Sequence, residues 1–117
     1  MRIIKRFSHA VQGLIHVFRT EASFRFQVIA AVVVVSSLIL LPLATWERVL
    51  LVLMVAAVLV LEVMNTILER LADALKPRLD PIVKEVKDMM AGAVLLTSVT
   101  AVVVAIMILW DFLATLL

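Results

Sequence analysis

The sequence predicts an all-α membrane protein of one domain, residues 1–117, with a helix at the membrane surface followed by three membrane-spanning helices. Two observations carry this prediction. Of the 117 residues, 65% are hydrophobic and only 17% are charged, whereas soluble domains are about 45–50% apolar and about 25% charged. Three stretches are also long enough to cross a bilayer, which takes roughly 20 apolar residues. A chain this short cannot bury such an apolar excess in a soluble core.

The composition excludes several other classes of protein. The chain has no Cys, which excludes a disulfide framework and a Cys-based zinc site. It is also too hydrophobic to be disordered. The formal net charge of +2 is too small to argue for nucleic-acid binding, so no nucleic-acid partner is expected.

Residues 1–20 predict an amphipathic helix that lies in the membrane surface. Apolar residues recur there at three- and four-residue spacing, and basic or polar residues occupy the positions between them. The apolar positions are Phe7, Val11, Leu14, Ile15 and Phe18, and the others are Arg2, Lys5, Arg6, Gln12 and Arg19. No apolar run precedes a small-residue cleavage site, so a signal peptide is not expected. The remaining alternative is an ordinary soluble helix that packs on another part of the protein.

The predicted spans cover residues 26–46, 49–69 and 89–111. A backbone in lipid must satisfy its own hydrogen bonds, and spans of this length suit helices better than strands. The polar segment 70–88 contains Pro77 and Pro81 and therefore predicts a loop between the second and third spans.

The basic residues predict the orientation of the chain, because cytoplasmic segments carry an excess of Lys and Arg. Basic residues gather before the first span and in the 70–88 loop. They are Arg2, Lys5, Arg6, Arg19 and Arg25 in the first group and Arg70, Lys76, Arg78, Lys84 and Lys87 in the second. We therefore expect the N-terminus and the 70–88 loop on the cytoplasmic side and the C-terminus outside.

Four polar residues at relative positions 0, 3, 7 and 11 form a polar stripe, which consists of Glu62, Asn65, Glu69 and Asp73. At about 100° per residue they fall within an arc of roughly 80° on one helix face. A charge at the bilayer centre costs about 2.5–3.5 kcal/mol, so the stripe is expected to face a partner helix or a polar cavity. Glu69 lies roughly 10 Å of helix rise closer to the cytoplasm than Glu62. A lipid headgroup can therefore reach Glu62, and a water-soluble molecule can reach Glu69.

Two charged pairs lie on the same side of the predicted membrane. Glu21 and Arg25 stand where the surface helix meets the first span, and Lys87 and Asp88 precede the third. Each pair alone also fits an ordinary ion pair or a helix cap. Carboxylate and amide oxygens suit Mg²⁺, which typically takes one or two carboxylates with phosphate oxygens and waters. Together with the polar stripe, the pairs favour a functional site.

The segment Glu62-Val-Met-Asn65-Thr66-Ile-Leu-Glu69-Arg-Leu-Ala-Asp73 resembles the signature of the small bacterial diacylglycerol kinase family, which includes undecaprenol kinases. Two further segments, Glu21-Ala-Ser-Phe24-Arg25 and Lys87-Asp88-Met-Met-Ala-Gly-Ala-Val94-Leu95, resemble the family's first and third motifs. The resemblance covers nearly the whole chain. It implies a kinase of the bacterial inner (cytoplasmic) membrane, a homotrimer of three-span subunits with sites between protomers. Such a kinase transfers the γ-phosphate of MgATP to a lipid hydroxyl.

The resemblance also implies roles for individual residues. Glu62 would be the catalytic base for the hydroxyl of the lipid substrate, which Glu62 and Arg25 would contact. Mg²⁺ would be held by Glu21 and Glu69. The residues implied to bind the nucleotide are Asn65, Glu69, Asp73, Lys87, Asp88, Arg6, His9 and Gly13. Phosphoryl transfer depends on positioning, charge neutralisation and a proton acceptor rather than on a covalent nucleophile, and these residue types can supply all three.

The resemblance leaves two lipid substrates open. The first motif is similar to the Gram-negative branch of the family, whereas Asp80-Pro81-Ile-Val-Lys84 and Ala91-Gly92-Ala93 are similar to the Gram-positive branch, whose members prefer undecaprenol. We expect diacylglycerol to be the substrate and phosphatidic acid the product, with undecaprenol as the alternative.

Two hypotheses from other classes compete with the kinase. A proton- or cation-coupled transporter would also carry a Glu within the membrane, but it predicts a lone carboxylate near mid-bilayer rather than a stripe that reaches the surface. A non-catalytic adaptor would use the stripe only to join protomers, although such contacts average only about 0.6 kcal/mol. Phosphate transfer to a lipid distinguishes the kinase from both.

Overall fold

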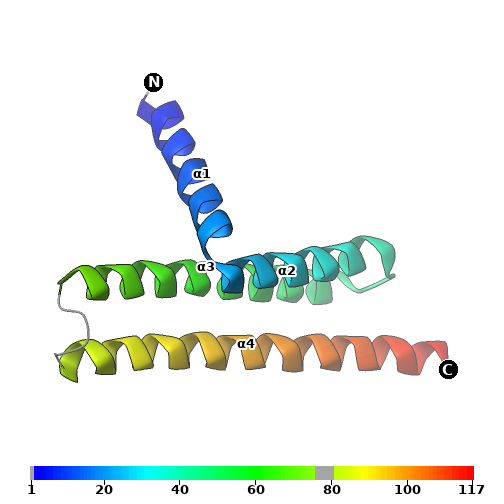
Figure 1. Cartoon of the computed structure of the whole chain (residues 1–117). Coiled ribbons are helices and arrows are strands. Elements are labelled where there is room, and N and C mark those ends of the chain that lie inside the picture. Colours follow the sequence, from blue (N-terminus) through cyan, green and yellow to red (C-terminus); the bar gives the residue numbers. More distant parts are fainter. Residues whose placement is uncertain (1, 76–80) are drawn as a thin grey trace.

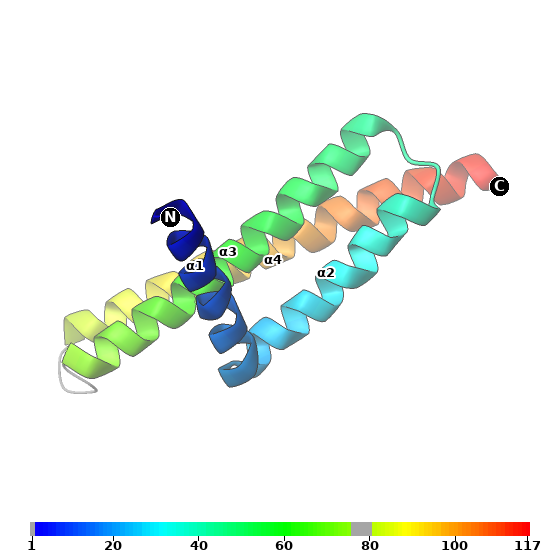
Figure 2. The ribbon, with the colours of Figure 1, turned by 90° about the horizontal axis from the view of Figure 1, so that it is seen from above.

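The computed structural model of the protein describes residues 2–75 and 81–117. In these residues the chain forms four helices, α1 (Arg2–Thr20), α2 (Ala22–Leu40), α3 (Thr45–Leu75) and α4 (Pro81–Leu116). The last three run side by side, and α1 projects steeply away from them (Figures 1 and 2). The α3 helix packs against both α2 and α4. This arrangement makes α3 the element that connects the rest of the fold.

The three long helices are apolar enough to cross a membrane. Most of their large apolar side chains remain exposed, including Ile29, Leu53 and Ile106. A small buried cluster of Leu38, Leu43, Leu51 and Ile108 joins the helices at the end remote from the polar stripe. Such an outward-facing apolar surface suits a protein that has lipid as its solvent, with backbone hydrogen bonds satisfied inside each helix.

The first apolar helix is shorter than the span predicted at residues 26–46. It ends at Leu40, and Leu41 has an extended backbone with φ −96° and ψ 144°. The cause is Pro42, because a proline disfavours helical conformation in the residue before it. Trp46 lies in the first turn of α3. The predicted span was therefore wrong at its C-terminal end, where the apolar residues continue but the helix does not.

Helices enter the segment 70–88 from both ends, so the loop predicted there is too long, and its residues 76–80 lie outside the described residues. The α3 helix continues to Leu75, and α4 begins at Pro81. A proline is well tolerated at the first position of a helix, where its missing N–H would have no partner anyway. Pro77 lies outside the described residues. Ala, Leu, Glu, Lys and Arg are all good helix formers, so the polar composition of this segment does not end either helix.

The α1 helix forms where residues 1–20 predict one, and it meets α2 at a bend centred on Glu21. The backbone of Glu21 is extended, with φ −120° and ψ 112°. On the other side of the bend, Nη1 of Arg25 donates hydrogen bonds to the carbonyl oxygens of Phe18 at 2.9 Å and Arg19 at 3.0 Å. The last carbonyls of a helix have no partner within the helix, and a cation there is favourable. Arg25 therefore caps α1.

Candidate functional site

The predicted catalytic base, Glu62, lies at the contact between α3 and α2. It is 6% exposed. From the first turn of α2, the Ser23 hydroxyl donates a hydrogen bond of 3.2 Å to Oε2 of Glu62. One turn further along α3, the Thr66 hydroxyl donates to the backbone carbonyl of Glu62 at 3.1 Å. The stripe was expected to face a partner helix or a polar cavity, and for Glu62 this is confirmed by its packing against α2.

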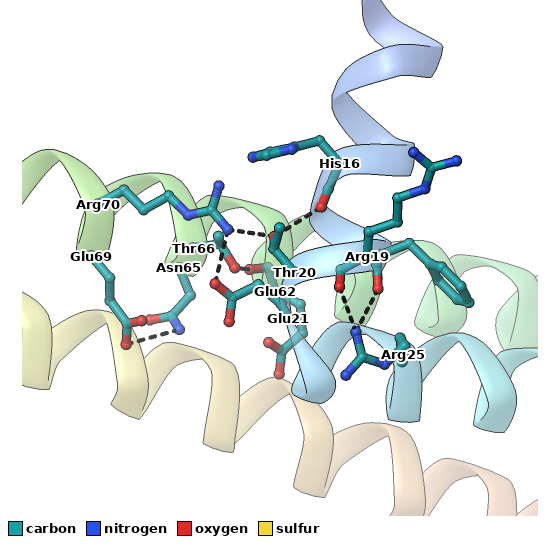
Figure 3. A network of polar contacts seen from close by, with 11 residues as sticks. His16, Arg19, Thr20, Glu21, Arg25, Glu62, Asn65, Thr66, Glu69 and Arg70 are labelled. Atoms are coloured by element: carbon teal, nitrogen blue, oxygen red, sulfur yellow. Dashed lines mark hydrogen bonds and ion pairs between the residues drawn. The ribbon is translucent and has the colours of Figure 1, made fainter.

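The Arg70 side chain connects α3 to the bend between α1 and α2 (Figure 3). Its Nη2 donates to the Thr20 hydroxyl at 2.6 Å and to Oε1 of Glu21 at 3.0 Å. The Thr20 hydroxyl in turn donates to the carbonyl oxygen of His16. Glu21 makes no side-chain cap for α2, and its carboxylate is bound to Arg70 instead.

The lower part of the polar stripe lies beside α4. Asn65 and Glu69 are joined by a hydrogen bond of 3.4 Å from Nδ2 to Oε1, and in Figure 3 their side chains point away from the bend at Glu21. Further along, Lys87 of α4 donates to Oδ1 of Asp73 at 2.9 Å. The structure therefore divides the site into two adjacent parts, with Glu62 facing α2 and Asp73 facing α4.

Burial decreases along the stripe toward the C-terminus of α3. Glu62 is buried, Asn65 is half-buried, and Glu69 and Asp73 are exposed. Oδ1 of Asn65 is buried and accepts no hydrogen bond from the described residues. The side chain of Glu69 is thus open to solvent, whereas that of Glu62 is enclosed by the protein.

An apolar cavity of about 410 Å³ lies between α2, α3 and α4. Gln27 and Val58 line it, one helical turn from Ser23 and Glu62 respectively, so it begins next to the buried carboxylate. Most of its lining is apolar side chains; one exception is Ser98, whose buried hydroxyl has no hydrogen-bond partner in the described part of the chain. Its composition suits hydrocarbon rather than a polar ligand.

Several predicted site residues are not brought to the stripe. Arg6, His9 and Gly13 lie exposed on α1, the helix that projects away from the other three (Figure 1). A Cβ added to Gly13 would contact nothing within 4 Å. Nothing in a single chain therefore explains a glycine at that position.

The predicted metal ligands Glu21 and Glu69 belong to different polar contacts, with Arg70 and Asn65 respectively. Across residues 2–75 and 81–117, no three His, Asp or Glu side chains gather as a metal site. Asp88 pairs with Lys84 at 2.8 Å on the exposed surface of α4. Glu21 and Asp88 are thus paired with cations of the same chain, whereas Glu69 accepts only from the Asn65 amide among the described residues.

Sequence reasoning missed Ser23, Thr20 and Arg70 as members of the site. Ser23 and Thr20 are isolated hydroxyl residues that belong to no periodic pattern. Arg70 was used only as one of the basic residues that predict the orientation of the chain in the membrane. Ser23 and Glu62 are 39 residues apart, and Arg70 and Glu21 are 49 apart. Only the packing of α2 on α3 brings them together.

Comparisons with known proteins identify the family of the chain. The chain matches the prokaryotic diacylglycerol kinase family over residues 8–109. It is 32% identical to the undecaprenol kinase of Bacillus subtilis strain 168, over 92% of this chain and 87% of the relative. It is 30% identical to the diacylglycerol kinase of Escherichia coli strain K12, over 94% and 90%, and 32% identical to that of Pseudomonas aeruginosa, over 85% and 82%. The chain therefore belongs to the prokaryotic diacylglycerol kinase family and is a bacterial membrane lipid kinase.

Proposed function

We propose that this kinase transfers the γ-phosphate of MgATP to the hydroxyl of diacylglycerol and so produces phosphatidic acid. One observation carries the proposal: a buried carboxylate, Glu62, lies between an apolar cavity and a set of increasingly exposed polar residues. The cavity can take the hydrocarbon of a lipid, and the exposed residues can take a water-soluble nucleotide. The family assignment favours this function over a transporter or an adaptor.

In the proposed reaction Glu62 is the general base. The lipid hydroxyl gives its proton to the Glu62 carboxylate while its oxygen forms a bond to the γ-phosphorus. The bond from that phosphorus to the oxygen bridging the β-phosphate breaks, and ADP leaves with the electron pair. The proton then passes from Glu62 to water.

The donor set fits Mg²⁺ as the ion that accompanies the nucleotide. Mg²⁺ typically binds one or two protein carboxylates together with phosphate oxygens and waters. Glu69 and Glu21 are such carboxylates, and Oδ1 of Asn65 is a buried acceptor without a hydrogen-bond partner in the described chain. When bound, the ion would neutralise charge on the transferred phosphate. Glu21 would have to exchange its contact with Arg70 for this role.

The proposed nucleotide site continues along the exposed part of the stripe. Lys87 and Asp73, which join α4 to α3, would contact the nucleotide together with Asp88. With only two glycines in the chain, a Gly-rich phosphate loop cannot form. Lys87 is therefore proposed as a main source of positive charge for the phosphates.

A homotrimer is proposed because Arg6, His9 and Gly13 lie on α1, away from the stripe of their own chain. If sites form between protomers, α1 of one subunit can contribute these residues to the nucleotide site of another. Arg25 is proposed to contact the lipid headgroup in addition to capping α1.

The proposed placement in the membrane follows from the basic residues. The α1 helix would lie in the cytoplasmic surface of the bacterial inner membrane, with its apolar positions toward lipid and its basic positions toward headgroups. The N-terminus and segment 70–88 would be cytoplasmic and the C-terminus outside. Trp46 and Trp110, at the other ends of their helices, would lie at the outer interface, where aromatic residues are enriched.

Undecaprenol is the second candidate substrate, because the chain is 32% identical to an undecaprenol kinase over 92% of its length. The test offers diacylglycerol and undecaprenol separately in mixed micelles and measures transfer of labelled γ-phosphate, with Glu62→Gln as control. Transfer to diacylglycerol that is lost in the variant supports the proposal. Transfer to undecaprenol alone would show that undecaprenol, and not diacylglycerol, is the substrate. Transfer to neither lipid by a folded protein contradicts the proposed function.

A further inference from the structure

We propose that Ser23 is a positioning residue that holds the Glu62 carboxylate in the orientation needed to accept the proton of the lipid hydroxyl. The inference rests on the proposed role of Glu62 as general base. It is carried by one contact between two helices, the 3.2 Å hydrogen bond from Oγ of Ser23 to Oε2 of Glu62.

The burial of Glu62 makes this donor important. The residue is 6% exposed, so few waters can reach its oxygens, and a buried carboxylate needs donors from the protein. Thr66, the nearest hydroxyl on α3, donates to the backbone carbonyl of Glu62 rather than to its carboxylate. Within the described residues, the Ser23 hydroxyl is the donor found on the carboxylate.

The position of Ser23 at the bend leaves its hydroxyl free for this contact. Serines inside α2 donate back to their own helix, as Ser36 does to the carbonyl oxygen of Val32 at 2.8 Å, which is the usual alternative for a helical serine. The carbonyl four residues before Ser23 belongs to Arg19 in α1, beyond the extended backbone of Glu21, and so lies outside the helix of Ser23. The bend therefore removes the usual backbone acceptor of a helical serine.

The hydrogen bond distinguishes the two oxygens of Glu62. Oε2 is occupied by Ser23, and Oε1 is left to accept the proton. Oε2 remains an acceptor after Oε1 is protonated, so the contact persists through the reaction and fixes the rotation of the carboxylate. Holding a base in its productive geometry lowers the barrier without contributing to substrate affinity. We therefore expect Ser23 to affect kcat rather than KM.

The experiment compares Ser23→Ala, Ser23→Thr and Ser36→Ala in the full-length protein in mixed micelles. For Ser23→Ala we expect a roughly tenfold fall in kcat, as for loss of a hydrogen bond to a charged group, with KM for lipid and ATP changed less than about twofold. Ser23→Thr keeps the hydroxyl and should recover most of the loss. Ser36→Ala, which removes a hydroxyl from the same helix away from Glu62, should behave as wild type.

Three results for the Ser23 variants would overturn the inference. An unchanged kcat in Ser23→Ala shows that the contact does not position the base, as does an equal loss in Ser23→Thr, or a change confined to KM. Glu62→Gln, measured in parallel, distinguishes a failure of the proposed base from a failure of the positioning role of Ser23. If it abolishes transfer while Ser23→Ala is fully active, the base stands and the positioning role fails. If Glu62→Gln keeps its turnover, the proposed base fails and the inference fails with it.

Discussion

The guanidinium of Arg70 on α3 lies 3.0 Å from the carboxylate of Glu21 at the bend between α1 and α2. The two side chains are 42% and 33% exposed, and ion pairs at this exposure contribute only about 0–1 kcal/mol to stability. With the further bond from Arg70 to Thr20, the contact acts mainly as a geometric constraint. It holds the α1–α2 bend beside the part of α3 that carries Glu62.

Arg70→Ala should therefore loosen α1 without unfolding the protein. We expect faster amide hydrogen exchange over residues 2–20 and a loss of global stability below about 1 kcal/mol. Arg19→Ala is the matched control, because Arg19 contributes to the bend through its backbone carbonyl. Equal exchange rates in Arg70→Ala and wild type would show that the bend is held by other contacts.

Loss of the α1 cap should change hydrogen exchange along α1 differently from loss of Arg70. Arg25→Ala removes both hydrogen bonds to the carbonyls of Phe18 and Arg19, so the last turn of α1 should fray. Exchange should rise first at the C-terminal end of α1, and stability should fall by about 1 kcal/mol. Measurement by hydrogen exchange with mass spectrometry resolves the two ends of the helix. An increase limited to the N-terminal end would contradict the capping role.

Glu62→Gln tests the base separately from binding. The amide keeps the size of the side chain and an acceptor for Ser23, so the protein should remain folded and bind MgATP as before. Its kcat should fall by at least about 100-fold, the usual contribution of a general base. Single-turnover transfer and nucleotide titration on the same sample check both expectations. Normal turnover would contradict the role of Glu62.

Glu69→Gln should act on the metal and the nucleotide rather than on the proton. Removing one carboxylate ligand is expected to raise the Mg²⁺ concentration at half-maximal activity by about tenfold. Glu85→Gln is the control, since Glu85 is an exposed carboxylate on α4 outside the stripe. If both variants shift the Mg²⁺ dependence equally, the effect is one of general charge and not of ligation.

Lys87→Met should weaken nucleotide binding and the contact between α3 and α4. Lys87 is the half-buried member of the ion pair with Asp73, with 35% of its side chain exposed. Its loss should raise KM for ATP by about tenfold, as for a lost charged contact to phosphate. Lys84→Met removes a cation that is 79% exposed and should change KM much less. Equal effects would argue against a specific role for Lys87.

The sequence predicts most of the fold because its main signals are local. Continuous apolar stretches identify the membrane helices, and the spacing of Glu62, Asn65, Glu69 and Asp73 places them on one face of a helix. The same signals fail at helix ends. Residues 41–46 remain mostly apolar although the helix stops before Pro42, and segment 70–88 becomes polar although both helices continue into it.

The candidate site was predictable only in part, because its contacts cross between helices. Glu62 was found from its position within an apolar helix, where a charge is expensive. Ser23 stands in the segment that resembles the family's first motif, but a serine at the start of a helix is common and no role could be inferred for it. Arg70 was visible only as one of several basic residues, and its partners, Thr20 and Glu21, are about 50 residues away.

By itself, the sequence determined the helical class, the three membrane helices and the residues of the polar stripe, because hydropathy and helical period depend on neighbouring residues alone. The tertiary structure decided which side chains meet: Ser23 with Glu62, Arg70 with Glu21, and Lys87 with Asp73. It also decided where α1 leaves the bundle (Figure 2). These contacts depend on the packing of helices and on the bend at Glu21, and the spacing of residues within one helix carries no information about either.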